Sequence, residues 1–441
     1  MKSERAGGLR RRALDVLDRN RRGDWTCPSS RIYPHQWLWD SCFVAIGLAR
    51  ADPERAASEV RALLRGQWAN GMLPHMIFAP DVRDAGSRRL WRSRADARAP
   101  RDVATSCITQ PPLPAVAAWH VAAALPDDRA GAFLAEVVPA IVRYHEWLYR
   151  ERDLRGDGLV ALVHPWECGL DTTPSWMQLL ARWRGPWWMR IAQRLRLARV
   201  VRFFRTDTRY LPATQRASDD DGLRMLALAR VAKRHGFDAA RISLSGDGVL
   251  VEDLAFNTLL ALANECLRDL ARRTGTSIDP SLEARLALTG GALDSLWDDA
   301  RGHPTSRDVT TGDAVDAPTI AMLLPLVTDL PPERAAQLVA VLRAARFQPA
   351  HPVPSVPTDA AEFDPERYWK GPTWVNTNWL LVRGLERHGE HALAAELAGH
   401  TLDMVDEHGF AEYFSPLTGE GYGAPEFSWT AALVLELLAV V

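Results

Sequence analysis

Carboxylates that lie beside aromatic side chains are the groups of this sequence best suited to acid–base chemistry. The loop at residues 164–174 holds two of them, Glu167 and Asp171, directly after an apolar run. Gly169 permits backbone angles that other residues avoid, and a proline at 174 suits the first turn of a helix, so Asp171 is expected near a loop-to-helix junction. There its carboxylate either caps the helix or takes part in catalysis.

Three other segments, distant in the sequence, have the same character: residues 33–42, 370–379 and 412–421. Each places Trp or Tyr near Asp, Asn, Gln or Glu. Aromatic faces pack against the apolar faces of a sugar ring, while short polar side chains bind its hydroxyls. The chain has 17 Trp against 7 Tyr. A single Trp is more often a core residue, but the four segments together predict a carbohydrate pocket.

Composition predicts a globular protein with a large core, because 47% of the 441 residues are apolar and 24% are charged. The net charge is only -2, which leaves no overall excess of cations to neutralise nucleic acid phosphates. Arginine clusters at residues 10–12 and 194–205 are interpreted as solvated helix faces. The expected partner is therefore a small molecule, and nucleic acid is not expected.

The five cysteines are odd in number and widely spaced, without a CxxC pair, which indicates reduced thiols rather than a disulfide framework. Residues 1–20 lack the continuous apolar segment of a signal peptide. No stretch reaches the length of a bilayer-spanning helix. These patterns predict a cytoplasmic protein that does not act at a membrane.

Apolar residues recur with helical spacing along most of the chain, whereas strand patterns are few and short. The best strand pattern is at residues 159–163. About fourteen helices are predicted, many of them in pairs: 10–19, 36–50, 54–68, 114–124, 130–150, 174–199 with a break at 185–186, 218–233, 252–273, 281–297, 317–324, 332–345, 372–388, 391–407 and 426–440. Without alternation of strands and helices, a doubly wound sheet and a β/α barrel are disfavoured. An all-α fold, either a closed toroid or a large bundle, is expected.

Four motifs in order along the chain resemble the landmarks of glycoside hydrolase family 63, and most closely those of its short bacterial glucosylglycerate and mannosylglycerate hydrolases. They are QWLWD at 36–40, WECGLD at 166–171, GPTW at 371–374, and EY at 412–413 together with FSWT at 427–430. The resemblance implies one (α/α)6-barrel domain over residues 1–441 and inverting hydrolysis of an α-glycosidic bond. It also implies that Asp171 is the general acid and Glu412 the general base.

Reasoning from the residues gives the same division of roles. Asp171 has apolar neighbours, and desolvation would favour its protonated form, whereas Glu412 must stay ionised to activate water. Glu167 is the alternative acid because it shares the loop. Glu426 is the alternative base because it too precedes an aromatic segment, although a carboxylate at a helix start is its expected role.

The remaining expectations concern substrate binding. By resemblance, Asp40 and Gln110 bind sugar hydroxyls. A glycerate group would need a cation, for which Arg205 or Arg209, helped by Tyr210, is a candidate, although both arginines could equally lie on a solvated turn. The full set of expected binding residues is Tyr33, Trp37, Trp39, Asp40, Gln110, Trp166, Gly169, Arg205, Tyr210, Trp374 and Trp379.

No metal or nucleotide cofactor is expected, because the sequence has no HExxH motif, no close Cys/His cluster, no GxGxxG and no P-loop. Two alternatives stay open beside hydrolysis of a glycerate-containing glycoside. One is a trehalase-like hydrolase of a neutral α-glucoside, and the other is a sugar-binding protein without hydrolytic activity. The choice between glucose and mannose is also open.

Overall fold

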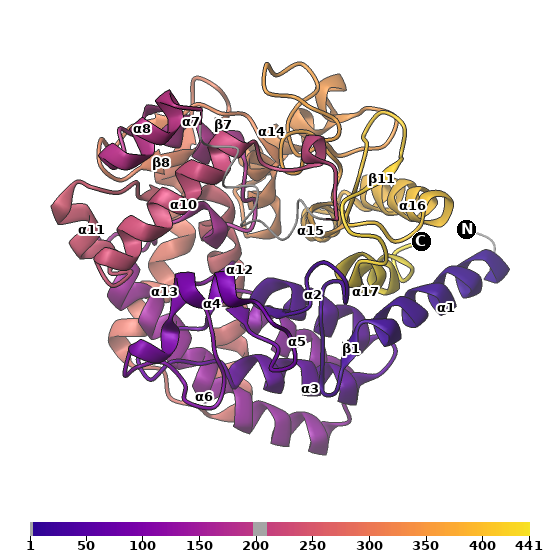
Figure 1. The fold of residues 1–441 in the computed structure, drawn as a ribbon. Coiled ribbons are helices and arrows are strands. Elements are labelled where there is room, and N and C mark those ends of the chain that lie inside the picture. Colours follow the sequence, from indigo (N-terminus) through magenta and orange to yellow (C-terminus); the bar gives the residue numbers. More distant parts are fainter. Residues whose placement is uncertain (1–2, 197–209) are drawn as a thin grey trace.

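Helices form a closed ring in two layers in the computed structural model, which describes residues 3–196 and 210–441 (Figure 1). The inner elements of the described chain are α2 (Leu38–Ala49), α5 (Pro114–Ala124), α12 (Leu254–Thr274), η7 (Ile320–Val327), α15 (Val375–Arg387) and α17 (Ser428–Leu437). Each contacts the next in this order, and α17 packs on α2 to close the ring.

A second layer of helices surrounds this ring. It consists of α1 (Ser3–Arg19), α3 (Pro53–Leu64), α6 (Asp127–Arg152), α13 (Pro280–Ala292), α14 (Pro332–Arg343) and α16 (His391–His408). Among other contacts, α3 packs against α2 and α5, α6 against α5 and α12, and α16 against α15 and α17. The arrangement is an (α/α)6 barrel, as the sequence predicts.

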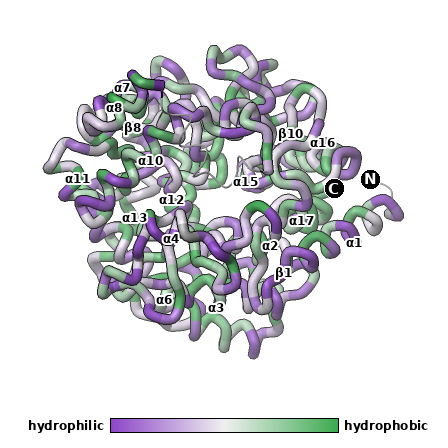
Figure 2. The backbone as a smooth tube through the Cα atoms, viewed as in Figure 1, coloured by the Kyte–Doolittle hydropathy of each residue, from purple (hydrophilic) through white to green (hydrophobic). Residues whose placement is uncertain are grey.

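The hydrophobic pattern of each helix explains its layer. Every residue of α2 is buried, which fits an inner helix that is apolar on all sides. The outer helix α1 alternates hydrophobic and hydrophilic residues (Figure 2) and buries one face through Leu9, Ala13, Val16 and Leu17. One cluster of buried apolar residues includes members of both layers.

The chain leaves the two-layer ring between α6 and α12. The helices of this excursion within the described residues are α7 (Pro174–Arg182), α8 (Trp187–Arg194), α10 (Asp219–Arg234) and α11 (Ala239–Ser245). The helix expected at residues 174–199 is interrupted around Gly185 and Pro186, as predicted, and its second part ends at Arg194. The short helix α4 (Ala85–Trp91) and α11 were not predicted from the periodicity.

Short 3-10 helices and strands connect these elements. The further 3-10 helices are η1 (Ser93–Ala95), η2 (Pro165–Glu167), η5 (Ala213–Gln215), η6 (Leu293–Leu296) and η8 (Ala345–Phe347). The strands are β1 (Arg21–Arg22), β2 (Trp25–Thr26), β3 (Gln36–Trp37), β4 (Met76–Ile77), β5 (Val251–Glu252), β6 (Trp297–Asp298), β7 (His303–Pro304), β8 (Ser306–Asp308), β9 (Ala314–Val315), β10 (Tyr413–Phe414) and β11 (Gly421–Tyr422).

All of the strand pairings are antiparallel: β1 with β2, β3 with β4, β6 with β7, β10 with β11, and β8 between β5 and β9. The strand expected at residues 159–163 does not form a ladder, because only Leu162 makes an isolated bridge, to Val251. Within the described ranges, no helix has both the length and the apolar character needed to cross a bilayer.

Candidate active site

Three carboxylates from separate parts of the chain lie close enough to influence one another. Asp40 is in the first turn of α2, Asp171 lies three residues before α7, and Glu412 directly precedes β10. Burial, and then the charges of Glu412 and Asp171, raise the pKa of Asp40 well above its ordinary value. These surroundings favour the protonated form of Asp40, and the site gathers this carboxyl with two further acidic groups.

The Glu412 side chain is buried and accepts hydrogen bonds on both oxygens. Nη2 of Arg216 donates to Oε2 at 2.8 Å and Nη1 to Oε1 at 3.3 Å. The hydroxyl of Tyr33 donates to Oε1 at 3.1 Å, and the backbone N–H of Ala424 donates to Oε2 at 2.8 Å. Every one of these groups is a donor toward Glu412, which fits an ionised carboxylate that accepts only.

A short hairpin fixes the position of Glu412. Strands β10 and β11 pair directly after it, and its backbone N–H donates to the carbonyl of Ala424 at 2.9 Å. Gly423 lies against its side chain, so that a Cβ there would come within 2.4 Å of Glu412 Oε2. The close approach requires glycine at this position.

The loop that carries Asp171 packs on an indole ring. Gly169 has φ +77, and a Cβ at this residue would lie 2.7 Å from the Trp39 ring. Asp171 itself is half-buried. The N-cap of α7 is Thr173, so Asp171 does not hold the capping position that the sequence left open for it. The packing of Gly169 on Trp39 fixes the loop that carries this carboxylate.

Arg216 and Tyr368 complete the surroundings of Glu412. The Arg216 guanidinium lies over the rings of Tyr33 and Tyr368, at 5.5 and 4.6 Å from the ring centroids. Burial, followed by the charges of Asp171 and Glu412, raises the pKa of Tyr368 well above its ordinary value. Tyr368 therefore lies near both carboxylates and keeps its hydroxyl proton.

The comparisons with known proteins cover nearly the whole chain. Residues 33–430 match the family described as Mannosylglycerate hydrolase MGH1-like glycoside hydrolase domain. A mannosylglycerate hydrolase from Thermus thermophilus is 36% identical over 430 residues, which cover 96% of this chain and 99% of that protein. The chain belongs to glycoside hydrolase family 63.

Two further relatives agree with this assignment. A glucosylglycerate hydrolase from Mycolicibacterium hassiacum is 32% identical over 98% of this chain and 97% of its own length. A crystal structure of the family 63 mannosylglycerate hydrolase from Thermus thermophilus, in complex with Tris and D-glycerate, superposes with a TM-score of 0.86 at 35% identity. That match covers 97% of this chain and 99% of the solved one. The resemblance, the barrel and the enzyme class predicted from the motifs are confirmed.

The two alternative carboxylates lie in settings that suit structural roles in this glycoside hydrolase. Glu167 is fully buried and accepts from Arg152 at 2.8 and 2.9 Å, and from the backbone N–H of Val163 and Thr109 at 2.7 and 3.3 Å. It ties the Asp171 loop to α6 and to the segment before α5. Glu426 is exposed and forms an ion pair with Arg19 at 3.0 Å.

Three of the tryptophans expected to bind sugar are almost entirely buried: Trp39, Trp374 and Trp379. Trp374 stacks on Trp369 with 3.8 Å between ring centroids, and Trp39 packs against Trp369 at 6.2 Å. Trp379 contacts Phe43 at 6.0 Å. These contacts are all with other aromatic side chains, and a part for the three residues in binding sugar stays a prediction.

Trp37 and Trp166 are only half-buried, which leaves part of each side chain open to contact with a ligand. Trp37 meets the ring of Tyr33 edge-on at 6.1 Å, which places it beside the Glu412 cluster. Trp166 belongs to the Asp171 loop and packs edge-on against Trp91 at 5.9 Å. Both positions are consistent with the walls that the sequence predicts.

Buried polar atoms without a partner in the described chain occur in the predicted binding segments. They include Oε1 of Gln110, Nε1 of Trp37 and both side-chain amide atoms of Asn376. The backbone carbonyl of Gln110 accepts from Tyr144 at 3.2 Å, which fixes this residue in the loop before α5. Because buried polar atoms nearly always have partners, a bound water or ligand is expected to supply them here.

The sequence proposed a cation for a glycerate group at Arg205 or Arg209. Arg205 and Arg209 lie outside the described residues. Tyr210 is exposed, and the guanidinium of Arg31 lies 5.6 Å from its ring centroid. Arg216, which the motifs did not single out, is a buried cation beside Glu412; its proximity to the arginine-rich stretch was the signal for it in the sequence. No group of three metal-ligating side chains occurs within residues 3–196 and 210–441.

Proposed function

We propose that this glycoside hydrolase cleaves an α-linked glycoside of glycerate, with mannose or glucose as the sugar, and releases the sugar with inversion. The buried Glu412 and Arg216 pair beside Asp40 and Asp171 is the observation that carries the proposal. It combines an ionised carboxylate, further acidic groups and a cation in one site. Relatives named mannosylglycerate and glucosylglycerate hydrolase support the substrate class.

Asp171 is proposed as the general acid and Glu412 as the general base. Asp171 donates its proton to the glycosidic oxygen as the bond to the anomeric carbon breaks. Glu412 takes a proton from the water that attacks this carbon from the opposite face, so an α-glycoside gives the β-sugar. The donors that surround Glu412 keep its oxygens oriented, which lowers the cost of aligning the base.

Arg216 favours an anionic substrate over a neutral one such as trehalose. Two of its guanidinium nitrogens bind Glu412, while Nε has no hydrogen-bond partner among the described residues. A glycerate carboxylate that reached Nε would share the positive charge with Glu412 and would remain paired when desolvated. Arginine suits this bridging role because its planar group offers five donors.

A cytoplasmic location is part of the proposal. All five cysteines are unpaired and four of them are buried. Free thiols persist in the reducing cytoplasm, and buried thiols of this kind pack as small apolar groups.

The test is hydrolysis of mannosylglycerate, glucosylglycerate and trehalose, with the released anomer followed by NMR. We expect one glycerate-containing substrate to be hydrolysed, with the β-anomer as the first form of the released sugar.

Asp171→Asn and Glu412→Gln should each lower kcat on the order of 1000-fold. Glu426→Gln, which alters an exposed carboxylate, should retain normal turnover. Arg216→Lys should raise KM for the glycerate-containing substrate because lysine has no counterpart of the Nε–H group proposed to bind the glycerate carboxylate.

Three results would contradict separate parts of this proposal. Release of the α-anomer would contradict inversion. Hydrolysis of trehalose in preference to both glycerate-containing substrates would contradict the anionic aglycone, while full activity in Asp171→Asn would remove that residue from the mechanism.

A further inference from the structure

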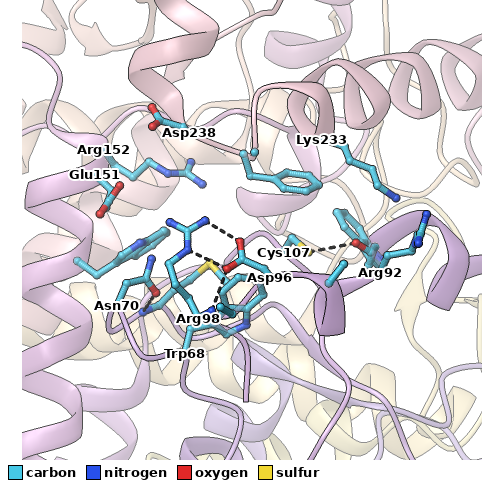
Figure 3. Close-up of a pocket in the computed structure, with 17 residues that line it drawn as sticks. Trp68, Asn70, Arg92, Asp96, Arg98, Cys107, Glu151, Arg152, Lys233 and Asp238 are labelled. Carbon is cyan, nitrogen blue, oxygen red and sulfur yellow. Dashed lines mark hydrogen bonds and ion pairs between the residues drawn. The ribbon is translucent and has the colours of Figure 1, made fainter. Parts of the chain in front are cut away.

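A cavity of about 520 Å³ is drawn with its lining residues in Figure 3. Its walls come from residues 68–72, from 91–98 at the end of α4 and beyond it, from the end of α6, and from 233–238 at the end of α10 and beyond it. None of Asp40, Asp171 and Glu412 lines it. A volume of this size is typical of sites for small molecules.

Aromatic side chains line much of the cavity. Trp68, Trp91, Trp147 and Phe237 contribute to the walls, and the rings of Trp91 and Phe237 lie 5.7 Å apart between centroids. The Nε1 group of Trp68 is already bonded to Thr105 at 3.0 Å. Trp68 can therefore offer a ligand only the apolar surface of its ring, and the Phe237 ring is apolar throughout; such surfaces suit the CH face of a sugar.

The carboxylates on the cavity wall are all paired. Asp96 binds Arg98 through two hydrogen bonds of 2.7 and 3.0 Å. Glu151 and Asp238 also have arginine partners, Arg150 at 3.2 Å and Arg241 at 3.5 Å. Arg152, another charged residue of the wall, is paired with the buried Glu167. This part of the cavity is neutralised by its own residues.

Two cations on the wall have no carboxylate partner among the described residues: Arg92 and Lys233. Both lie on the same side of the cavity (Figure 3). Nζ of Lys233 donates to the backbone carbonyls of Arg89 and Leu90, which leaves its charge uncompensated by an acid. Burial lowers the pKa of Lys233, and the positive charge of Arg92 also acts to lower it. An anion between the two side chains would relieve this repulsion.

The backbone conformation of Arg92 supports a ligand-binding role for the two cations. Arg92 ends α4 in the left-handed conformation, with φ +47 and ψ +40. Residues other than glycine adopt this region infrequently and at an energetic cost, and such residues often occur at ligand sites. The turn holds the Arg92 side chain at the cavity rather than along the helix.

The cavity also contacts the loop that carries Asp171. Trp91 packs edge-on against Trp166 at 5.9 Å. On the opposite wall, Arg152 donates to Glu167 at 2.8 and 2.9 Å. A molecule bound in the cavity would therefore touch two side chains that pack directly on residues 166–167, a few positions before the proposed acid.

We propose that this cavity binds a small anionic sugar, a sugar phosphate or a sugar acid, with its charged group at Arg92 and Lys233 and its ring against Phe237 and Trp91. A ligand in this cavity changes the turnover of the glycoside substrate through the Asp171 loop. This effect on turnover rests on the proposed function, whereas binding of the ligand in the cavity does not. The anionic group and the sugar ring are the shared chemistry of both ligand types.

Isothermal titration calorimetry on the full chain tests the binding, with glucose 6-phosphate, glucuronate and glucose as probes. We expect glucose 6-phosphate to bind, whether or not glucuronate also binds. Glucose should bind at least about tenfold more weakly than glucose 6-phosphate. Arg92→Ala and Lys233→Met should each weaken binding of glucose 6-phosphate about tenfold. Arg89→Ala, which removes an exposed arginine of the same helix that does not line the cavity, should have no effect.

Asp171→Asn separates this site from the catalytic one. It should bind glucose 6-phosphate like the wild type, even if the proposed hydrolysis fails. Absence of binding by both anions at millimolar concentration would overturn the proposal. So would loss of binding in Asp171→Asn with retention in Arg92→Ala, because that result places the ligand at the carboxylates. Unchanged kcat at saturating glucose 6-phosphate would overturn the effect on turnover.

Discussion

At the scale of single residues, the site depends on close backbone packing as much as on charge. Gly423 and Gly169 lie against Glu412 and Trp39 at distances that leave no room for a methyl group. The contact of Gly423 determines the position of the proposed base. The contact of Gly169 determines how closely the loop that carries Asp171 packs on Trp39. Positions without a functional group thus control the geometry of the carboxylates.

Gly169→Ala is expected to lower kcat on the order of 100-fold while the protein stays folded. The new methyl group would meet the Trp39 ring at 2.7 Å and push the Asp171 loop away from it. Steady-state kinetics and a thermal melt measure the two effects. Gly246→Ala is the control, because Gly246 also has a positive φ, +64, but nothing lies within 4 Å of its added Cβ. Equal kcat in both variants would contradict the contact as the cause.

At the scale of elements, the contact between α3 and α2 supports the start of α2, where Asp40 lies. Glu59 of α3 is buried and accepts from Ser41 at 2.5 Å and from Gln36 at 3.3 Å. These two residues flank the segment with Trp37 and Asp40. Burial is the main cause that raises the pKa of Glu59 from 4.5 to about 7. This outer helix therefore contacts the binding segment through a carboxyl group that titrates near neutral pH.

Glu59 should make stability depend on pH. Because its folded pKa is raised, the folded state binds the proton more tightly, and this contribution is complete below pH 4.5 and lost as pH rises through about 7. Urea unfolding at pH 5 and pH 8 should show a fall of about 2–3 kcal/mol from this group. Glu59→Gln should reduce the fall by that amount, whereas Glu54→Gln, an exposed change on the same helix, should not. The same fall in Glu59→Gln as in the wild type would contradict the assignment.

At the scale of the whole molecule, the ring is closed by contacts between elements near opposite ends of the chain. In Figure 1, α17 lies beside α2. Gly47 of α2 faces the backbone of Ala432, so closely that a Cβ would come within 2.1 Å of the carbonyl oxygen. Arg50 and Glu436 form an ion pair of 2.5 Å across the same two helices. The closure holds Asp40 on α2 next to the hairpin of Glu412, which precedes α17.

Gly47→Ala should reduce the free energy of unfolding by about 3 kcal/mol, because the added methyl group meets backbone that moves only with the whole helix. It should also lower activity by separating α2 from α17. Chemical unfolding followed by far-UV circular dichroism measures the stability change. Gly8→Ala on the outer helix α1, where nothing lies within 4 Å, is the control and should stabilise slightly. A stability loss in Gly8→Ala as large as that in Gly47→Ala would contradict the packing explanation.

The sequence by itself determined the helices, their pairing and the segments that contain the site. Helical periodicity depends on neighbours three and four residues apart, so it can be read without the fold. The motifs around Asp171 and Glu412 are likewise contiguous, and they predicted the family correctly. The weak strand pattern at 159–163 and the short helices α4 and α11 were misread, because tertiary contacts rather than local pattern decide such short elements.

Tertiary structure alone decided which side chains meet. Glu167 and Asp171 share one loop, yet only the fold brings Arg152 to Glu167 and leaves Asp171 beside the Glu412 cluster. Arg216 reaches Glu412 from 196 positions away in the chain. Ion pairs and burial depend on distances in space, which a linear pattern does not specify, and so the cation of the site became visible only in the folded protein.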